Sequence, residues 1–371
     1  MNNFFIRPKI TVCTSAEEFC LSYNIGSGDL VFVSEGTRRR NFANAFAGAL
    51  VVDYRKYVVG EPTDIMIEDI SRIIGSQKIS RIFAIGGGTI LDAAKLFALK
   101  QNIPVDKLFN GEILPQKDKK LFLIPTTCGT GSEVTDISIL ELTKNKTKLG
   151  LANEALFADE AILIPELLQN LPYKFFAASS MDALIHAVES YTSPKATEFT
   201  RIFSAAAIEK IISGYKLITS EGKKVIPSLL RDFLTASTYA GIAFGNAGCA
   251  AVHALSYPLG AARHVPHGEA NYAFFIEVYK TYASIRQDGS FELLKQFLAK
   301  LLACTPNNVL AELETLLENI IQRKTLHEYG VIEEELPRYT GIVMEKQGRL
   351  MSNNYVPLNR DKVLGIYQKL F

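Results

Sequence analysis

The 371-residue sequence lacks net charge and has few cysteines and histidines, and each shortage excludes a class of protein. A net charge of +1 gives no electrostatic attraction for nucleic acid or for an anionic membrane. The short basic clusters at 38–40 and 117–120 are typical of solvated surface. The five cysteines form no CxxC pair, so we expect reduced thiols in a cytoplasmic protein and neither a disulfide framework nor a zinc ribbon.

A secretion signal and a membrane span are also missing from the pattern. The opening residues "MNNFFIRPKI" show no basic stretch followed by an apolar one, so we predict no signal peptide. The most apolar window, 242–262, contains Asn246, His253 and Pro258, which would be costly in lipid. We therefore predict a buried core helix there, no membrane association, and a small molecule as the partner.

The pattern of secondary structure changes near residue 170, and the length favours two domains. Pro165 and Pro172 bracket the boundary, which gives an α/β domain at 1–169 and an all-helical domain at 170–371. Strand–helix alternation in the first domain predicts a parallel sheet with helices on both faces, and a cleft between two domains is where sites usually lie. Strands are expected at 29–35, 50–54, 79–88 and 120–127, helices at 38–49, 63–77 and 89–100, and further helices at 173–192, 201–218, 225–244 and 270–286.

Two loops rich in glycine and threonine follow consecutive predicted strands. "AIGGGTILDAAK" (84–95) lets backbone N–H groups at a helix start approach an anion, although a structural tight turn is about equally consistent with it. "IPTTCGTGSEVT" (124–135) adds hydroxyls at Thr126, Thr127, Thr130 and Thr135 that suit ribose, phosphate or a nicotinamide amide. The Glu35 carboxylate could accept a hydrogen bond from a ribose hydroxyl and repel a 2′-phosphate, which favours NAD over NADP. The positive charges of Arg38 to Arg40 lie close by and weaken this preference.

A carboxylate and three imidazoles form the second candidate site. Asp182 and His186 are four residues apart in a helical pattern, so they leave the same face of one helix. His253 and His267 add two more imidazoles, and such a set suits a divalent first-row metal. Packed core histidines and a lone Asp–His hydrogen bond are the alternative.

Five motifs together resemble the iron-containing (group III) alcohol dehydrogenase family: "GGGT", "DAAK", "PTTCGTGSEVT", "DALIHAVE" and "HALSYPLGAARHVPHGEAN". The resemblance implies a homodimeric NAD(P)-dependent alcohol/aldehyde oxidoreductase of the dehydroquinate synthase-like architecture, holding Fe²⁺, with Zn²⁺ as an alternative. It places the metal ligands on Asp182, His186, His253 and His267. It places cofactor contacts on Gly87, Gly88, Thr89, Thr126, Thr127, Thr135 and Lys148.

The sequence also departs from the family pattern. Tyr257 stands where many members have a histidine that is a candidate proton carrier, and His264 precedes His267 by three residues. We therefore consider His264 and Tyr257 as proton carriers, each against a purely structural role. Arg263 is the nearest cation to the motif and suits a substrate carboxylate, unless it faces solvent.

The combined motifs most resemble the subgroup that acts on 4-hydroxybutyrate, with succinate semialdehyde as its aldehyde. Three other readings stay open. The first is a short-chain diol or lactaldehyde reductase of the same family. The second is a non-redox NAD/metal enzyme of the dehydroquinate synthase type, and the third is a sensor without enzymatic activity.

Overall fold

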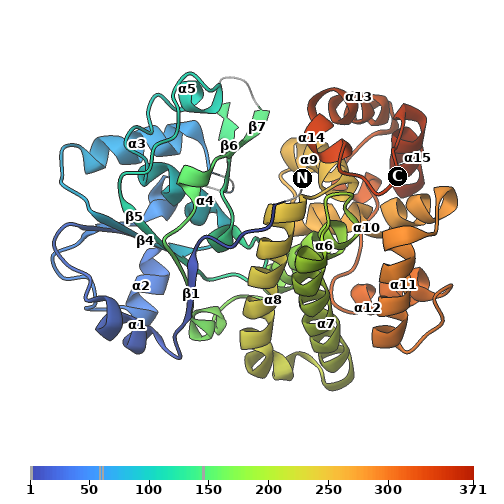
Figure 1. The fold of residues 1–371 in the computed structure, drawn as a ribbon, viewed down its shortest axis with the longest axis horizontal. Coiled ribbons are helices and arrows are strands. Elements are labelled where there is room, and N and C mark those ends of the chain that lie inside the picture. The colour runs from blue at the N-terminus through green and yellow to red at the C-terminus, as the bar shows by residue number, and fades with distance from the viewer. Residues whose placement is uncertain (1–2, 58–59, 61, 144–146) are drawn as a thin grey trace. The chain divides into compact units, whose positions relative to one another are not determined.

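In the computed structural model, the chain divides into two compact units, 6–171 and 172–371, the second of which also includes the first five residues (Figure 1). The structure describes all residues except 1–2, 58–59, 61 and 144–146, and it leaves the side chain of Thr147 undescribed. The observed division at 171–172 lies two residues from the predicted boundary. The N-terminal residues join the helical unit because Phe4 stacks on Phe199, and because Phe5 and Asn246 exchange two 3.0 Å hydrogen bonds.

The first unit contains a parallel sheet, as predicted, but the sheet has six strands where four were expected. Its order is β1-β8-β5-β4-β2-β3, and every neighbouring pair is parallel. The strands are β1 (Lys9–Val12), β2 (Asp29–Val33), β3 (Leu50–Val52), β4 (Arg81–Gly86), β5 (Lys120–Pro125) and β8 (Glu160–Leu163).

Helices cover both faces of this sheet because side chains of buried parallel strands alternate between two apolar faces (Figure 1). Phe32 of β2 packs on Phe97 of α4, with ring centroids 5.0 Å apart. Phe83 of β4 points the other way, toward Phe19 of α1, at 6.1 Å. The helices of this unit are α1 (Ala16–Tyr23), α2 (Glu35–Asn41), α3 (Asp64–Ile74), α4 (Gly88–Phe97) and α5 (Val105–Phe109).

Three strand elements of the first unit lie outside the predicted pattern. The edge strand β1 has four residues and leaves Ile10 and Val12 exposed, so it carries no clear apolar signal. The strand β8 has four residues and ends at Leu163, shortly before the unit boundary at 171–172. The third is an antiparallel hairpin of β6 (Ile137–Leu142) and β7 (Thr147–Ala152), which forms a separate two-stranded sheet.

The second unit is helical, and its central helix α6 matches the predicted 173–192. Packing against α7, α8 and α10 buries most of α6, which is why its sequence shows little polar–apolar alternation. The helices are α6 (Tyr173–Thr192), α7 (Glu198–Glu221), α8 (Ile226–Ala247), α9 (Ala251–Arg263), α10 (His267–Ile285), α11 (Gly289–Leu302), α12 (Val309–Glu318), α13 (Leu336–Lys346), α14 (Gly348–Met351) and α15 (Arg360–Leu370).

The apolar window 242–262 is not one helix, which corrects the prediction. Gly248 ends α8 with φ +76°, a left-handed conformation that glycine adopts without a steric penalty. The chain restarts as α9 at Ala251, so His253 lies in the first turn of a new helix. Within the described part of the chain, no helix is both long and apolar enough to cross a membrane.

Candidate metal centre and nucleotide loops

The helix α6 places the first two predicted ligands one turn apart. Asp182 and His186 are both buried, and Oδ2 of Asp182 lies 4.0 Å from Nδ1 of His186. The imidazole of His186 stacks on the ring of Phe244, with centroids 4.2 Å apart, which fixes its plane. The predicted i, i+4 pair therefore leaves one face of a buried helix.

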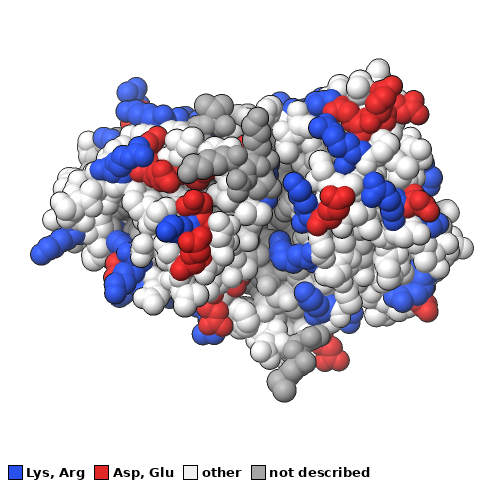
Figure 2. Space-filling model, turned by 90° about the horizontal axis from the view of Figure 1, so that it is seen from above, with Lys and Arg blue, Asp and Glu red and all other residues white. Residues whose placement is uncertain are grey.

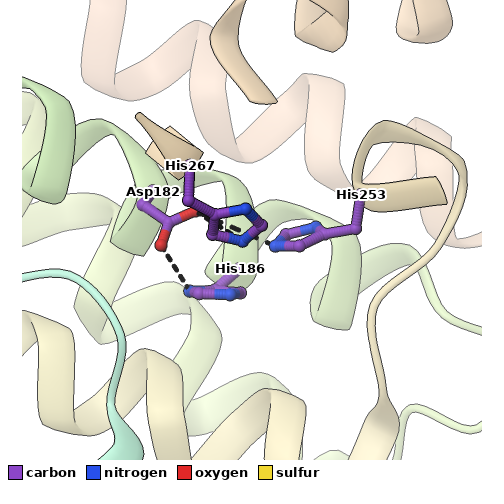
Figure 3. Close-up of side chains that lie close together, drawn as sticks. All are labelled: Asp182, His186, His253 and His267. Carbon is purple, nitrogen blue, oxygen red and sulfur yellow. Dashed lines mark ion pairs between the residues drawn. The ribbon is translucent and has the colours of Figure 1, made fainter. Parts of the chain in front are cut away.

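The helices α9 and α10 bring the other two ligands to the same point. Nε2 of His253 and Nε2 of His267 each lie 3.8 Å from Oδ1 of Asp182. One ligand atom from each of the four residues lies within 4.8 Å of all the others, and Figure 3 shows the side chains converging. We call Asp182, His186, His253 and His267 the metal cluster.

The metal cluster fits a divalent cation by chemistry as well as by geometry. Among the described residues, Nε2 of His253 is a buried polar atom without a hydrogen-bond partner, and it faces the cluster. Such an atom is costly to bury, and coordination would satisfy it. One carboxylate oxygen with three imidazole nitrogens is a donor set that suits Fe²⁺ or Zn²⁺.

Electrostatics keep Asp182 in its ligand form. Burial opposes its ionisation most strongly, but the imidazoles of His186, His267 and His253 and the amide of Asn271 act in the opposite direction. Together they hold the pKa of this carboxyl below its usual value. The group is therefore a carboxylate at neutral pH.

Two residues that the sequence patterns did not single out support the cluster. The Asn271 amide donates to Oδ1 of Asp182 at 2.7 Å, and Ser256 orients that amide by donating to its oxygen. Gly268 follows His267, and a Cβ at this position would lie 1.9 Å from the Ala178 carbonyl oxygen. Only glycine allows α10 to approach α6 this closely. Both residues belong to the quoted "HGEAN", but their roles depend on helix packing.

The two candidate proton carriers lie in different surroundings. Tyr257 of α9 is half-buried, and its ring centroid lies 6.0 Å from that of His267. His264 is exposed and caps the end of α9 in a left-handed conformation, with φ 52°. The structure therefore brings Tyr257, and not His264, to a ligand of the metal cluster.

Arg263, the predicted carboxylate contact, has protein partners. Its Nε and Nη2 donate to the Gly330 carbonyl at 3.1 and 2.9 Å, and Nη2 also donates to the Glu335 carboxylate. Nη1 makes a longer contact of 3.4 Å with the Ala262 carbonyl. These bonds tie the end of α9 to the segment that precedes α13.

The two predicted nucleotide loops lie against each other in the first unit. They follow the neighbouring strands β4 and β5, and Thr126 N donates to the Gly86 carbonyl at 2.9 Å. A Cβ on Gly88 would lie 2.7 Å from the Thr130 methyl, so a side chain there would push the loops apart. Gly87 caps α4 without a side chain of its own and faces Thr127. The helix start is therefore a surface of backbone N–H groups.

Thr135 lies deeper than the other threonines. It is buried, and its hydroxyl accepts a 3.2 Å hydrogen bond from Nζ of the fully buried Lys95. Lys95 also donates to the Ile137 carbonyl at 2.5 Å and lies 3.5 Å from Asp92. The "DAAK" motif thus ties α4 to the strand β6 from inside the domain.

The remaining predicted cofactor residues occupy the surface of the first unit. Thr89 Oγ1 donates to the Gly60 carbonyl at 3.1 Å. Lys148 pairs in register with Glu141 across the β6–β7 hairpin. Glu35 begins α2 directly after β2, and its Oε1 accepts from Arg39 Nε at 2.7 Å.

On the face drawn in Figure 2, basic and acidic side chains are interspersed, in keeping with the small net charge.

Comparison with known proteins gives consistent matches for both units. The model described as "Iron-containing alcohol dehydrogenase" matches residues 17–165, and "Fe-containing alcohol dehydrogenase family, C-terminal" matches 176–371. The 4-hydroxybutyrate dehydrogenase of Clostridium kluyveri is 43% identical over 366 residues, covering 99% of both chains. Long-chain-alcohol dehydrogenase 1 of Geobacillus thermodenitrificans is 34% identical, covering 79% of this chain and 75% of its own.

A solved structure shares the fold. The sulfoacetaldehyde reductase from Bifidobacterium kashiwanohense, in complex with NAD+, superposes with a TM-score of 0.85 at 22% identity. The match covers all of this chain and 98% of the reductase.

Proposed function

The chain belongs to the iron-containing alcohol dehydrogenase family, and from that premise we propose that it is an NAD-dependent dehydrogenase that interconverts 4-hydroxybutyrate and succinate semialdehyde. The observation that carries the proposal is the convergence of Asp182, His186, His253 and His267 within 4.8 Å. The full-length similarity to a 4-hydroxybutyrate dehydrogenase supports the choice of substrate over a diol or lactaldehyde.

The metal cluster would hold Fe²⁺, with Zn²⁺ as the alternative. When bound, such an ion supplies a Lewis acid for an alcohol or carbonyl oxygen. The protein contributes a carboxylate that stays ionised and imidazoles whose planes are set by packing on Phe244 and by buried hydrogen bonds. These contacts keep the donor atoms facing one point without substrate, which reduces the cost of arranging them.

NAD would bind at the two loops, and when bound it accepts or donates the hydride. Backbone N–H groups at Gly87, Gly88 and Thr89 suit the pyrophosphate. Thr126, Thr127 and Thr130 line the neighbouring loop, and Lys148 and Glu35 supply a cation and a ribose acceptor. Because Thr135 is buried and its hydroxyl bonds to Lys95, Thr135 would not contact the cofactor itself but would hold the loop in shape for the residues that do.

Tyr257 is the proton carrier that the geometry favours, since it lies beside His267. Its phenol oxygen would accept the proton of the substrate hydroxyl as the phenol releases its own proton to water, so that the tyrosine ends the step neutral. His264 is the second candidate, and its exposure gives direct exchange with solvent. Arg263 would bind the substrate carboxylate through Nη1, whose contact with the Ala262 carbonyl is long.

We propose that the protein is cytoplasmic and acts as a homodimer. None of the five cysteines, all of which the structure describes, forms a disulfide, in keeping with a reducing compartment. The edge strand β1 exposes Ile10 and Val12, a surface that natural proteins commonly cover. Light scattering on the purified protein would give the oligomeric state.

Metal analysis of anaerobically purified protein, with NADH oxidation measured in parallel, tests the function. We expect about one iron or zinc per chain and turnover with succinate semialdehyde. Faster turnover with lactaldehyde or a diol-derived aldehyde would instead assign the protein as a lactaldehyde or diol reductase of the same family. Bound metal and NAD without any NADH oxidation would favour a non-redox enzyme or a sensor.

A further inference from the structure

Glu189 is a fully buried carboxylate on the same stripe of α6 as Asp182 and His186. Its two oxygens accept hydrogen bonds from the first turn of α9 and from the residue before it. Oε2 accepts from Ala250 N at 3.0 Å, and Oε1 accepts from Val252 N at 2.7 Å. The break at Gly248 exposes these N–H groups, and a carboxylate at a helix start is electrostatically favourable.

The third contact of Glu189 is with a ligand of the metal cluster. Oε2 lies 2.6 Å from Nδ1 of His253, and both side chains are buried. An ionised carboxylate can only accept hydrogen bonds, so this contact requires the hydrogen of the imidazole to be on Nδ1. Cys249 also lies within 4.8 Å of both groups, but a thiol is the weaker acceptor.

The tautomer set by Glu189 decides what His253 offers to the metal cluster. With hydrogen on Nδ1, the neutral ring carries its lone pair on Nε2. Nε2 is one of the buried polar atoms that lack a hydrogen-bond partner among the described residues, and it lies 3.8 Å from Oδ1 of Asp182. The opposite tautomer would direct an N–H into the cluster and remove a ligand.

We propose that Glu189 is a positioning residue that fixes the orientation and tautomer of His253 for metal binding. The inference rests on the proposed function, because it assumes that the metal cluster binds a divalent ion. Carboxylates that hold a ligating histidine in this way typically contribute about 10- to 100-fold to metal affinity.

Glu189→Gln is the sharpest variant, because it keeps the size of the side chain. The glutamine amide has one oxygen, which accepts, and one NH₂ group, which donates. Its NH₂ group must face either the N–H of Val252 or the two groups Ala250 N–H and His253 Nδ1. Either orientation disturbs the hydrogen-bond pattern. Glu277→Gln is the matched control: Glu277 is also buried in the helical unit, but it pairs with Lys369 at 2.6 Å, away from the cluster.

Zn²⁺ is the probe, with its affinity measured by competition against a chromophoric chelator. We expect Glu189→Gln to bind Zn²⁺ about 10- to 100-fold more weakly than the wild type, and Glu277→Gln to bind it unchanged. Equal affinity in wild type and Glu189→Gln would overturn the inference while leaving the metal site intact. Absence of Zn²⁺ binding by the wild type would instead overturn the proposed function.

Nitrogen-15 labelling of histidine shows which ring nitrogen of His253 carries the hydrogen. A merely structural role of Glu189 would not determine this tautomer. The chain has five histidines, so long-range ¹H–¹⁵N spectra of the full protein stay simple, and a His253→Gln sample assigns the signal. We expect wild-type His253 to carry its hydrogen on Nδ1. A hydrogen on Nε2 in the wild-type protein would overturn the inference even if Glu189→Gln fails to fold.

Discussion

At the scale of single residues, three histidines that are close in sequence lie in different environments. His253 and His267 face Asp182, whereas His264 is exposed at the end of α9. The backbone of His264 is left-handed and ends α9, and α10 begins three residues later at His267, which belongs to the cluster. Proximity along the chain therefore does not indicate which imidazoles act together.

Tyr257→Phe tests the proton path. Removing the hydroxyl leaves the ring that packs near His267 but takes away the group that we propose as the proton carrier. We expect kcat/KM for 4-hydroxybutyrate to fall about 10²-fold or more and the pH–rate profile to lose a limb, since general acid–base groups contribute at least that much. His264→Ala is the control and should keep the wild-type profile; the reverse pattern would assign the proton to His264.

Arg263→Met tests recognition of the substrate carboxylate. A lost charged hydrogen bond should raise KM for 4-hydroxybutyrate about 10-fold or more and leave KM for 1-butanol unchanged. Steady-state kinetics on both alcohols give the comparison. If both KM values change alike, the bonds to Gly330 and Glu335 are the whole role of Arg263.

The sequence patterns identified all four members of the metal cluster, because ligand chemistry restricts those positions to a few residue types. Asn271, Gly268 and Glu189 lay inside the same motifs without a predicted role. Their roles depend on which helix faces which, and Gly268 matters only because Ala178 of α6 lies against it. Of the three, Glu189 had a signal in the sequence, since it lies seven residues after Asp182 on one helical stripe.

At the scale of elements, the long helices were predicted closely, whereas the short elements were not. The predicted 173–192 coincides with α6, whereas α2 begins at Glu35 and ends at Asn41 in place of the predicted 38–49. Ser34 caps α2 by accepting from Thr37 N, which starts the helix earlier. The strand β1 escaped prediction because an edge strand needs no apolar alternation.

Gly268→Ala tests the close approach of α6 and α10. The added Cβ would lie 1.9 Å from the Ala178 carbonyl oxygen and 3.0 Å from Asp182 Cβ, so the helices must separate. We expect the free energy of unfolding to fall by about 1–3 kcal/mol and Zn²⁺ binding to weaken. Gly365→Ala in α15 meets nothing within 4 Å and should be neutral or mildly stabilising. Equal urea midpoints for the two variants would contradict the close contact.

Glu160→Gln tests how β1 is held to β8. The carboxylate accepts from Thr11 and from Tyr23 at 2.6 Å and pairs with Lys9 at 3.0 Å. Burial opposes its ionisation, but these partners outweigh burial and hold the pKa of Glu160 below its usual value. The stabilisation is therefore present above the unfolded-state pKa and is lost as pH falls through the lower folded-state pKa.

At pH 7 we expect Glu160→Gln to lose about 1.5–3 kcal/mol of unfolding free energy, as for a hydrogen bond to a charged group. The difference from wild type should shrink below about pH 4. Urea titrations between pH 3 and 7 measure it. Glu154→Gln, which breaks an exposed ion pair with Arg7, should cost under about 1 kcal/mol. A loss from Glu160→Gln that does not vary with pH would refute the electrostatic explanation.

At the scale of the whole molecule, chemistry is divided between the two units. Every member of the metal cluster comes from the helical unit, and the two glycine-rich loops come from the α/β unit. The metal should therefore stabilise the helical unit directly, and NAD the α/β unit.

Metal removal tests this division. Chelation followed by Zn²⁺ at about 100 times its Kd should restore about 2.7 kcal/mol to the helical unit, a rise in Tm of roughly 5–10 °C. Differential scanning calorimetry of the full chain measures the change. The His186→Ala protein should show no such rise on Zn²⁺ addition, yet it should keep the stabilisation that NAD gives. A Zn²⁺-dependent rise in His186→Ala would place the ion elsewhere.

The wide spacing of the cluster along the chain has a kinetic consequence. Asp182 of α6 and His267 of α10 are far apart in the sequence, and their helices must already be docked before the donor atoms meet. An ion that recognises only the docked helices contributes little to the barrier of folding and much to that of unfolding. Metal uptake should therefore lengthen the lifetime of the native protein while leaving its rate of formation nearly unchanged.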